Sequence, residues 1–126
     1  MITSMFVQLS GAPDDSPAKQ FADQRLHKML EQTDDRLKDN KWLAGPEFTA
    51  ADVMSVYGLT TQRYFGPQVS LAPYQNILRW LQDCAARPAY KKALEAGDPE
   101  MKPLLDADAP AKSLLDGGVN NEHWKK

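Results

Sequence analysis

Few residues in this chain have the types and spacing that catalysis or metal binding requires. His27 and His123 are the only histidines, and Cys84 is the only cysteine. Metal sites need several His, Cys or carboxylate ligands at close spacing, and the sequence contains no Cys-x-x-Cys or His-Glu-x-x-His pattern. We therefore expect no metal. Cys84 lies on the apolar side of a helical pattern, which favours a structural thiol over a nucleophile.

Two pairs of adjacent carboxylates could in principle perform acid–base chemistry. Asp14-Asp15 lies in a predicted turn, and Asp34-Asp35 lies on a predicted solvated helix face, so neither pair carries much weight as a catalytic dyad. The glycine-rich and serine motifs of nucleotide-binding proteins and hydrolases are also missing. Four aromatic residues could form a binding surface, although aromatics at helical spacing more often belong to a core: Trp42, Tyr64, Phe65 and Trp80.

Composition sets the class of protein. The chain has 126 residues, of which 42% are hydrophobic and 25% charged, with a net charge of -2. This is enough apolar material for one core, and the charge balance gives no basic surface for nucleic acid or an anionic membrane. Residues 1–11 resemble no secretory signal, and no apolar run is long enough to span a membrane. A cytoplasmic protein is expected.

Helical periodicity dominates the chain, and strand alternation is missing, so the predicted fold class is all-α with about five helices. Residues 1–97 are expected to form one helical domain, in which residues 1–10 are a short, truncated first helix. Residues 98–126, rich in proline and glycine, are expected to form a mostly irregular tail. The remaining helices are predicted at residues 17–38, 49–64, 74–85 and 88–97.

The third of these helices begins with a strong start signal. Thr49 is placed as the N-cap, and Asp52, three residues later, can reach back to its amide in a capping box. Phe48 before the cap and Val53 after it occupy the positions of a hydrophobic staple. The helix that follows has almost no polar face, and a helix that is apolar all round is usually buried. We therefore expect it to be the buried centre of the bundle.

The stretches WLAGPEFTAADVM (42–54) and YQNILRWLQDCAARPAYKKALEAGDP (74–99) resemble the helical C-terminal half of glutathione transferases. The resemblance covers about residues 20–99. Fungal and bacterial members with a similar FTAAD segment are the nearest in character. In that family a capping box and staple open a buried helix, and here the matching residues are Phe48, Thr49, Asp52 and Val53. The resemblance therefore implies a structural role for these four.

The resemblance also implies what this chain lacks. Family members carry an N-terminal thioredoxin-like domain that binds glutathione, and nothing in this sequence matches its activating residue. Glutathione is therefore not expected to bind to this chain alone, and no other cofactor is implied. By position in the family's helices, a hydrophobic co-substrate pocket would be lined by Met5, Phe6, Tyr57, Arg63 and Tyr64.

Three functions remain open on the sequence alone. The first is a free-standing binding module, acting as a homodimer or with a protein partner, because apolar surface left uncovered by a missing domain marks an interface. The second is an enzyme of small-molecule metabolism that uses a hydrophobic cleft for glutathione-independent transfer, isomerisation or cyclisation. There, Arg63 could stabilise an oxyanion, although a surface role for it is favoured. The third is a fragment of a full transferase.

Overall fold

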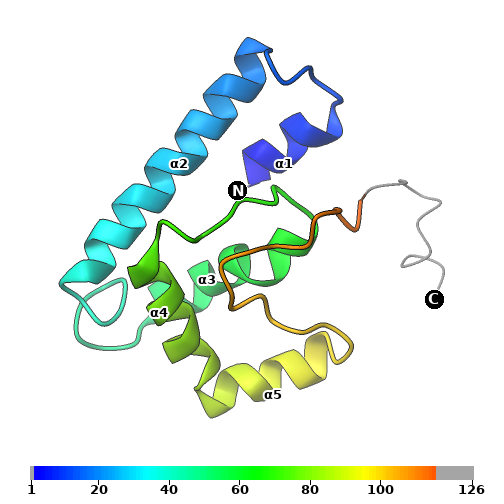
Figure 1. The fold of residues 1–126 in the computed structure, drawn as a ribbon. Helices are drawn as coiled ribbons and strands as arrows, with labels where there is room; N and C mark the ends of the chain where they lie inside the picture. Colours follow the sequence, from blue (N-terminus) through cyan, green and yellow to red (C-terminus); the bar gives the residue numbers. More distant parts are fainter. Residues whose placement is uncertain (1, 116–126) are drawn as a thin grey trace.

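Five α-helices and one short 3-10 helix make up the protein in the computed structural model, which describes residues 2–115 (Figure 1). No β-strand occurs within this range, so the predicted all-α class is confirmed. In the same range, no helix combines the length and the apolar character needed to cross a membrane. The helices are α1 Ile2–Leu9, α2 Pro17–Lys38, α3 Ala50–Leu59, η1 Thr61–Tyr64, α4 Gln75–Ala85 and α5 Pro88–Gly97.

The long helix α2 follows directly from its sequence. The Ser16 hydroxyl accepts a hydrogen bond from the Lys19 amide at 3.3 Å, and Pro17 occupies the first helical position. One stripe of apolar side chains, spaced by three and four residues and ending at Leu37, turns into the core. α1 lies antiparallel beside the N-terminal half of this helix (Figure 1).

The start of α4 is capped by a side chain from α2. Tyr74, the residue before α4, provides no side-chain cap. Instead, Asp34 accepts hydrogen bonds from the amides of Asn76 and Ile77, both at 2.9 Å, and from the Asn76 side chain at 2.8 Å. A carboxylate at this position satisfies amides that have no partner within the helix and meets the positive end of its dipole. The prediction that Asp34 lies on a merely solvated face is therefore wrong.

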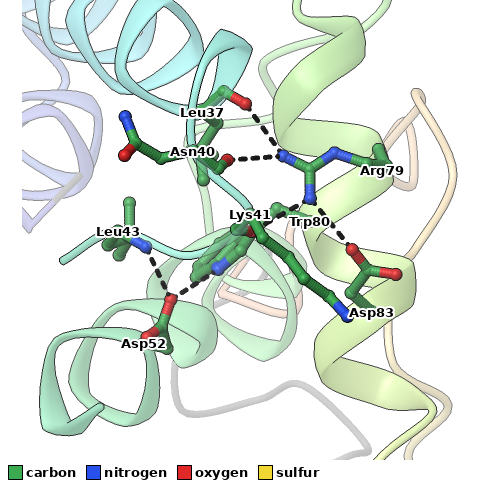
Figure 2. A network of polar contacts seen from close by, with 8 residues as sticks. All are labelled: Leu37, Asn40, Lys41, Leu43, Asp52, Arg79, Trp80 and Asp83. Carbon is green, nitrogen blue, oxygen red and sulfur yellow. Dashed lines mark hydrogen bonds and ion pairs between the residues drawn. The ribbon is translucent and has the colours of Figure 1, made fainter. Parts of the chain in front are cut away.

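The end of α2 is capped in return by Arg79 of α4. Its guanidinium donates to the carbonyl oxygens of Leu37 and Lys41 at 2.9 Å and of Asn40 at 3.0 Å, and it pairs with Asp83 at 2.9 Å (Figure 2). Leu37 lies in the last turn of α2, where the helix leaves carbonyls unpaired, and Asn40 and Lys41 follow the end of the helix. Each helix therefore caps one end of the other: α2 caps the start of α4, and α4 caps the end of α2.

The capping box at α3 is present, and its aspartate does more than cap the helix. Asp52 is 0% exposed. One carboxylate oxygen accepts from the Thr49 amide at 3.0 Å. The other accepts from the Leu43 amide at 3.0 Å and from the Trp80 indole N–H at 2.8 Å (Figure 2). Asp52 thus joins α3 to the preceding loop and to α4. Trp80 is fully buried, so it belongs to the core rather than to a binding surface.

The expectation that α3 is buried on all sides is wrong. Only Asp52, Val56 and Leu59 are buried, whereas the side chains of Val53, Met54 and Tyr57 are 58%, 82% and 53% exposed. α3 packs along one side on α4 and η1, and its other side faces solvent. The exposed fraction of Val53 also means that the staple position is largely open. Phe48 packs edge-to-face on Trp42, with ring centroids 5.0 Å apart.

The third helix also ends earlier than predicted. Thr60 leaves helical geometry with φ -114° and ψ -97°, and its hydroxyl donates to the Val56 carbonyl at 2.9 Å. This local bond competes with continuation of the helix, and the chain proceeds as the 3-10 turn Thr61–Tyr64. The predicted helix over residues 49–64 is therefore two elements.

The segment after α5 contains no helix or strand over residues 98–115, but it is packed on the domain. The Leu71 amide donates to the Ala107 carbonyl at 2.8 Å, and the Leu114 amide donates to the Tyr64 carbonyl at 2.9 Å. Residues 102–114, called the C-terminal strap below, thus cross η1 and the loop that follows it (Figure 1). The rest of the predicted tail, with His123, lies outside the described residues, as does Met1.

The buried carboxylate of Asp52 should make stability depend on pH. Burial raises its pKa, but the hydrogen bonds from Leu43, Thr49 and Trp80 outweigh that effect and hold the pKa below the ordinary 3.8. A lowered folded-state pKa means that the carboxylate stabilises the fold above about pH 5 and that this contribution is lost as the pH falls through the folded pKa.

We expect Asp52→Asn to lower the free energy of unfolding by about 2 kcal/mol at pH 7, because the amide loses the charge-assisted bonds and turns a donor toward a donor. Urea unfolding of both proteins between pH 3 and pH 7 measures this. The difference should shrink toward pH 3. A difference that is constant across this range would mean that the carboxylate charge contributes nothing.

Candidate functional site

The five residues expected to line a co-substrate pocket come from three elements. Met5 and Phe6 lie on α1, Tyr57 lies on α3, and Arg63 and Tyr64 lie in η1. Of the five, only Tyr57 lines one of the two cavities described below. Neither of these two cavities is therefore built from this set, and its role in substrate binding stays a prediction.

Arg63 is a structural residue that anchors the C-terminal strap. It is 0% exposed, and its guanidinium donates to the carbonyls of Asp106 at 3.1 Å, Ala107 at 2.7 Å and Val69 at 3.4 Å. Burial lowers its pKa, and the nearby charges of Asp108 and Asp106 oppose that shift. The surface position favoured from the sequence is wrong. With its terminal nitrogens committed to carbonyls, Arg63 is not placed to stabilise an oxyanion.

Tyr64 is held by the same strap. Its hydroxyl donates to the Lys102 carbonyl at 2.8 Å, and its own carbonyl accepts from Leu114. The neighbouring Ser113 hydroxyl donates to the Phe65 carbonyl at 2.6 Å. A phenol engaged in this way holds two segments together, and a role in proton transfer would require the strap to release it.

α1 carries an unusual distribution of polar and apolar residues. Its small polar Ser4 is buried against α2, where the hydroxyl donates to the Ala22 carbonyl at 3.3 Å. Ile2, Phe6 and Leu9, spaced by four and three residues, share the opposite face and are 61%, 62% and 50% exposed. We call these three residues the α1 stripe. An apolar stripe that points away from its own domain is an exposed patch of the kind that marks interaction sites.

The α1 stripe continues into a groove between α1, α2 and α3. This α1–α3 groove has a volume of about 770 Å³ and is bordered by Ile2 of the stripe and by Met54, the most exposed apolar side chain of α3. Arg25 and Lys28 of α2 add positive charge to its lining. Ile2 thus belongs both to the α1 stripe and to the border of this groove, whose lining mixes apolar, polar and charged side chains.

A second, smaller cavity lies on another side of α3. This α3–α5 pocket has a volume of about 280 Å³ and is lined mainly by apolar and aromatic side chains of α3, α4 and α5. Cys84 lies at its inner wall and is 1% exposed. Burial, reinforced by the negative charges of Asp52 and Asp83, raises the pKa of this thiol to about 12. Cys84 is therefore protonated near neutral pH and is not an activated nucleophile. This agrees with the structural thiol that the sequence favoured.

The sequence did not predict the positions that three charged residues take in the structure. Asp34 and Arg79 form the caps described above, and Arg87 stands at the rim of the α3–α5 pocket. An Arg directly before the Pro that opens α5 gave no signal by its type. Across residues 2–115, no three His, Cys, Asp or Glu side chains are grouped as metal ligands would be.

Comparison with known proteins gives the family. The model of the glutathione S-transferase C-terminal domain matches residues 2–88. The chain belongs to this family. The match includes α1 and ends at the start of α5, whereas the resemblance seen in the sequence ran from about residue 20 to residue 99. The all-α architecture described above is therefore that of a glutathione S-transferase C-terminal domain.

Several curated relatives are similar over part of their length. Glutathione S-transferase F11 of Arabidopsis thaliana is 34% identical over 95 residues, covering 72% of this chain and 43% of the relative. Glutathione S-transferase 3 of Zea mays is 38% identical over 90 residues, covering 70% of this chain and 40% of the relative. The chain thus matches about two fifths of each. No solved structure matches it.

The anchoring role of Arg63 can be tested directly. We expect Arg63→Leu to lower the free energy of unfolding by at least about 2 kcal/mol, because three strap and loop carbonyls lose their donors. Hydrogen exchange should rise most at the amides of Leu71 and Leu114, which bond across the strap. The charge-removing change Lys92→Gln on exposed α5 is the control. Unchanged exchange at both amides in the Arg63 variant would contradict the anchoring role.

Proposed function

We propose that this chain acts as a protein-binding module and that its α1 stripe packs against the α1 stripe of a second copy. The observation that carries this proposal is the outward direction of Ile2, Phe6 and Leu9, three large apolar side chains that are each at least 50% exposed. Their exposure costs free energy in water, at roughly 25 cal/mol per Å² of apolar surface, which contact with a partner would recover.

A second copy suits this stripe because α1 contains no charged residue over Ile2–Leu9. Two such helices approach without like-charge repulsion and without burying an unpaired charge. Phe6 lies near the middle of the stripe, with Ile2 and Leu9 on either side. An antiparallel, isologous contact would therefore place Phe6 near its own copy and Ile2 near Leu9.

The proposed contact is small. An eight-residue helix is about 12 Å long, so even with Met54 added at one end the contact stays below the roughly 1,600 Å² of a standard stable interface. We accordingly propose a weak, reversible dimer that forms at tens of micromolar or above. A larger assembly would need the surface of a further protein or domain.

The other functions have less support. A glutathione-independent enzyme would need convergent side chains, and of the residues expected for it only Tyr57 lines either of the two cavities described above. Transferase activity is a property named for the relatives, and this chain matches only 43% and 40% of the two described above. We propose that glutathione does not bind to this chain alone. We also propose a cytoplasmic location, on the basis of the amino-acid composition.

The stripe contact is tested by placing a charge in it. We expect Phe6→Glu to remove self-association, because two carboxylates would meet at the centre of an apolar contact. Sedimentation velocity from about 5 to 500 µM measures the change, with the wild-type chain expected to shift toward dimer over this range.

Gln24→Glu adds the same charge on an exposed position of α2 and is the matched control, expected to dimerise like the wild type. Circular dichroism confirms that each variant is folded. A wild-type chain that stays monomeric throughout, or a Phe6→Glu variant that dimerises as well as the control, would refute the proposed contact.

A further inference from the structure

The α3–α5 pocket has features of a ligand site that self-association through α1 does not use. Its volume of about 280 Å³ is close to the lower end of typical small-molecule sites, roughly 300–1,000 Å³, so it suits a compact ligand. Phe48, Tyr57, Tyr90 and Leu94 contribute aromatic and aliphatic walls. Tyr57 is 53% exposed, so part of this wall faces solvent. These walls favour a flat, apolar ring.

Thr61 brings a hydroxyl to the lining of this pocket. Thr61 lines the cavity and is 5% exposed, yet its hydroxyl bonds to no residue among those the structure describes. Its neighbour Thr60, in contrast, donates to the Val56 carbonyl. The Thr61 hydroxyl is not among the buried side-chain atoms that lack a partner within residues 2–115, so it reaches open space. A polar atom of a ligand in the pocket can therefore bond to it.

A cation without a carboxylate partner stands at one end of the same pocket. The Arg87 guanidinium lies 3.7 Å from the centre of the Phe48 ring and forms no ion pair with any residue in the range 2–115. Arg87 is also the N-cap of α5, and that helix end has no side-chain cap, so the positive end of the helix dipole adds to its charge.

The one acidic residue that lines the pocket does not cancel this field. Asp98 follows the last residue of α5, whereas Arg87 precedes the first, and ten helical residues separate them by about 15 Å. The pocket is therefore polarised along α5, with its positive end at Arg87. An anionic group would bind at that end.

We infer that the α3–α5 pocket binds an aromatic monocarboxylate with a hydroxyl substituent on the ring. The ring lies between Phe48, Tyr57 and Leu94, and the carboxylate pairs with Arg87. The ring hydroxyl forms a hydrogen bond with Thr61. This site is separate from the α1 stripe and does not depend on the proposed self-association.

The test is a titration of the ¹⁵N-labelled full chain followed by two-dimensional NMR. The probe is 6-hydroxy-2-naphthoate, and two analogues each lack one group: 2-naphthoate lacks the hydroxyl, and 6-hydroxy-2-naphthamide lacks the charge. We expect saturable shifts at the amides of residues 57–61, 87 and 89–94. The full probe should bind about two- to fivefold more tightly than either analogue, as expected for one half-exposed ion pair or one hydrogen bond.

Each protein variant should remove only the matching preference. Arg87→Gln should abolish the preference for the carboxylate, whereas Arg87→Lys, which keeps the charge, should retain most of it. Thr61→Val, which has the same shape without the hydroxyl, should abolish the preference for the ring hydroxyl. Phe6→Glu should bind the probe as the wild type does, which separates this site from the α1 contact.

Occlusion of the pocket supplies the matched control. Ala93→Trp places a bulky ring in the lining and should abolish binding, while Ala96→Trp, on the same helix but outside the lining, should not. The inference is overturned if the probe causes no saturable shifts up to 5 mM or if the shifts map to the α1–α3 groove. It is also overturned if Arg87→Gln keeps the preference for the carboxylate and Thr61→Val keeps the preference for the ring hydroxyl. Equal binding of the probe by Ala93→Trp and Ala96→Trp would overturn it too.

Discussion

A single buried carboxylate connects the parts of this domain that are far apart in the sequence. Asp52 accepts hydrogen bonds from the loop before α3 through Leu43, from the helix start through Thr49 and from α4 through Trp80. A buried charge without such partners would cost several kcal/mol, so the three donors must stay in place together. Because both cavities border α3, the position of this helix determines their shapes.

The helices α2 and α4 are held together by charged caps as well as by apolar packing. Asp34 of α2 caps the start of α4, and Arg79 of α4 caps the end of α2. The core between them is apolar and closely packed, with Leu30, Ile77, Leu81 and Trp80 each 0% exposed. The fold therefore does not require contacts from the exposed faces of α1 and α3. The α1 stripe carries the proposed self-association, and Tyr57 on α3 contributes to the proposed ligand pocket.

Local signals in the sequence predicted most of the fold. Ser16 and Pro17 gave the start of α2, and Pro88 and Gly97 gave both ends of α5, because caps and breakers act within a few residues. Thr49 and Asp52 gave the capping box for the same reason. The early end of α3 was missed, because a threonine that bonds back to the preceding turn has no distinctive pattern in the sequence.

The candidate sites were harder to predict, because they depend on contacts between distant segments. The sequence favoured a surface position for Arg63, because its hydrogen-bond acceptors belong to the strap, more than 40 positions later in the chain. The apolar character of α3 suggested burial, whereas Val53, Met54 and Tyr57 in fact form an exposed face. Hydrophobicity in a sequence shows that a residue benefits from leaving water, but it does not distinguish a core from an interface.

The central claim is that the Asp52 carboxylate links α3 to α4 through the indole of Trp80. A double-mutant cycle with Asp52→Asn and Trp80→Phe, measured by urea unfolding at pH 7, isolates this link from the packing that each change also disturbs. We predict that the two losses of unfolding free energy are not additive and that the coupling is about 1 kcal/mol. Losses that add within about 0.3 kcal/mol would contradict the account.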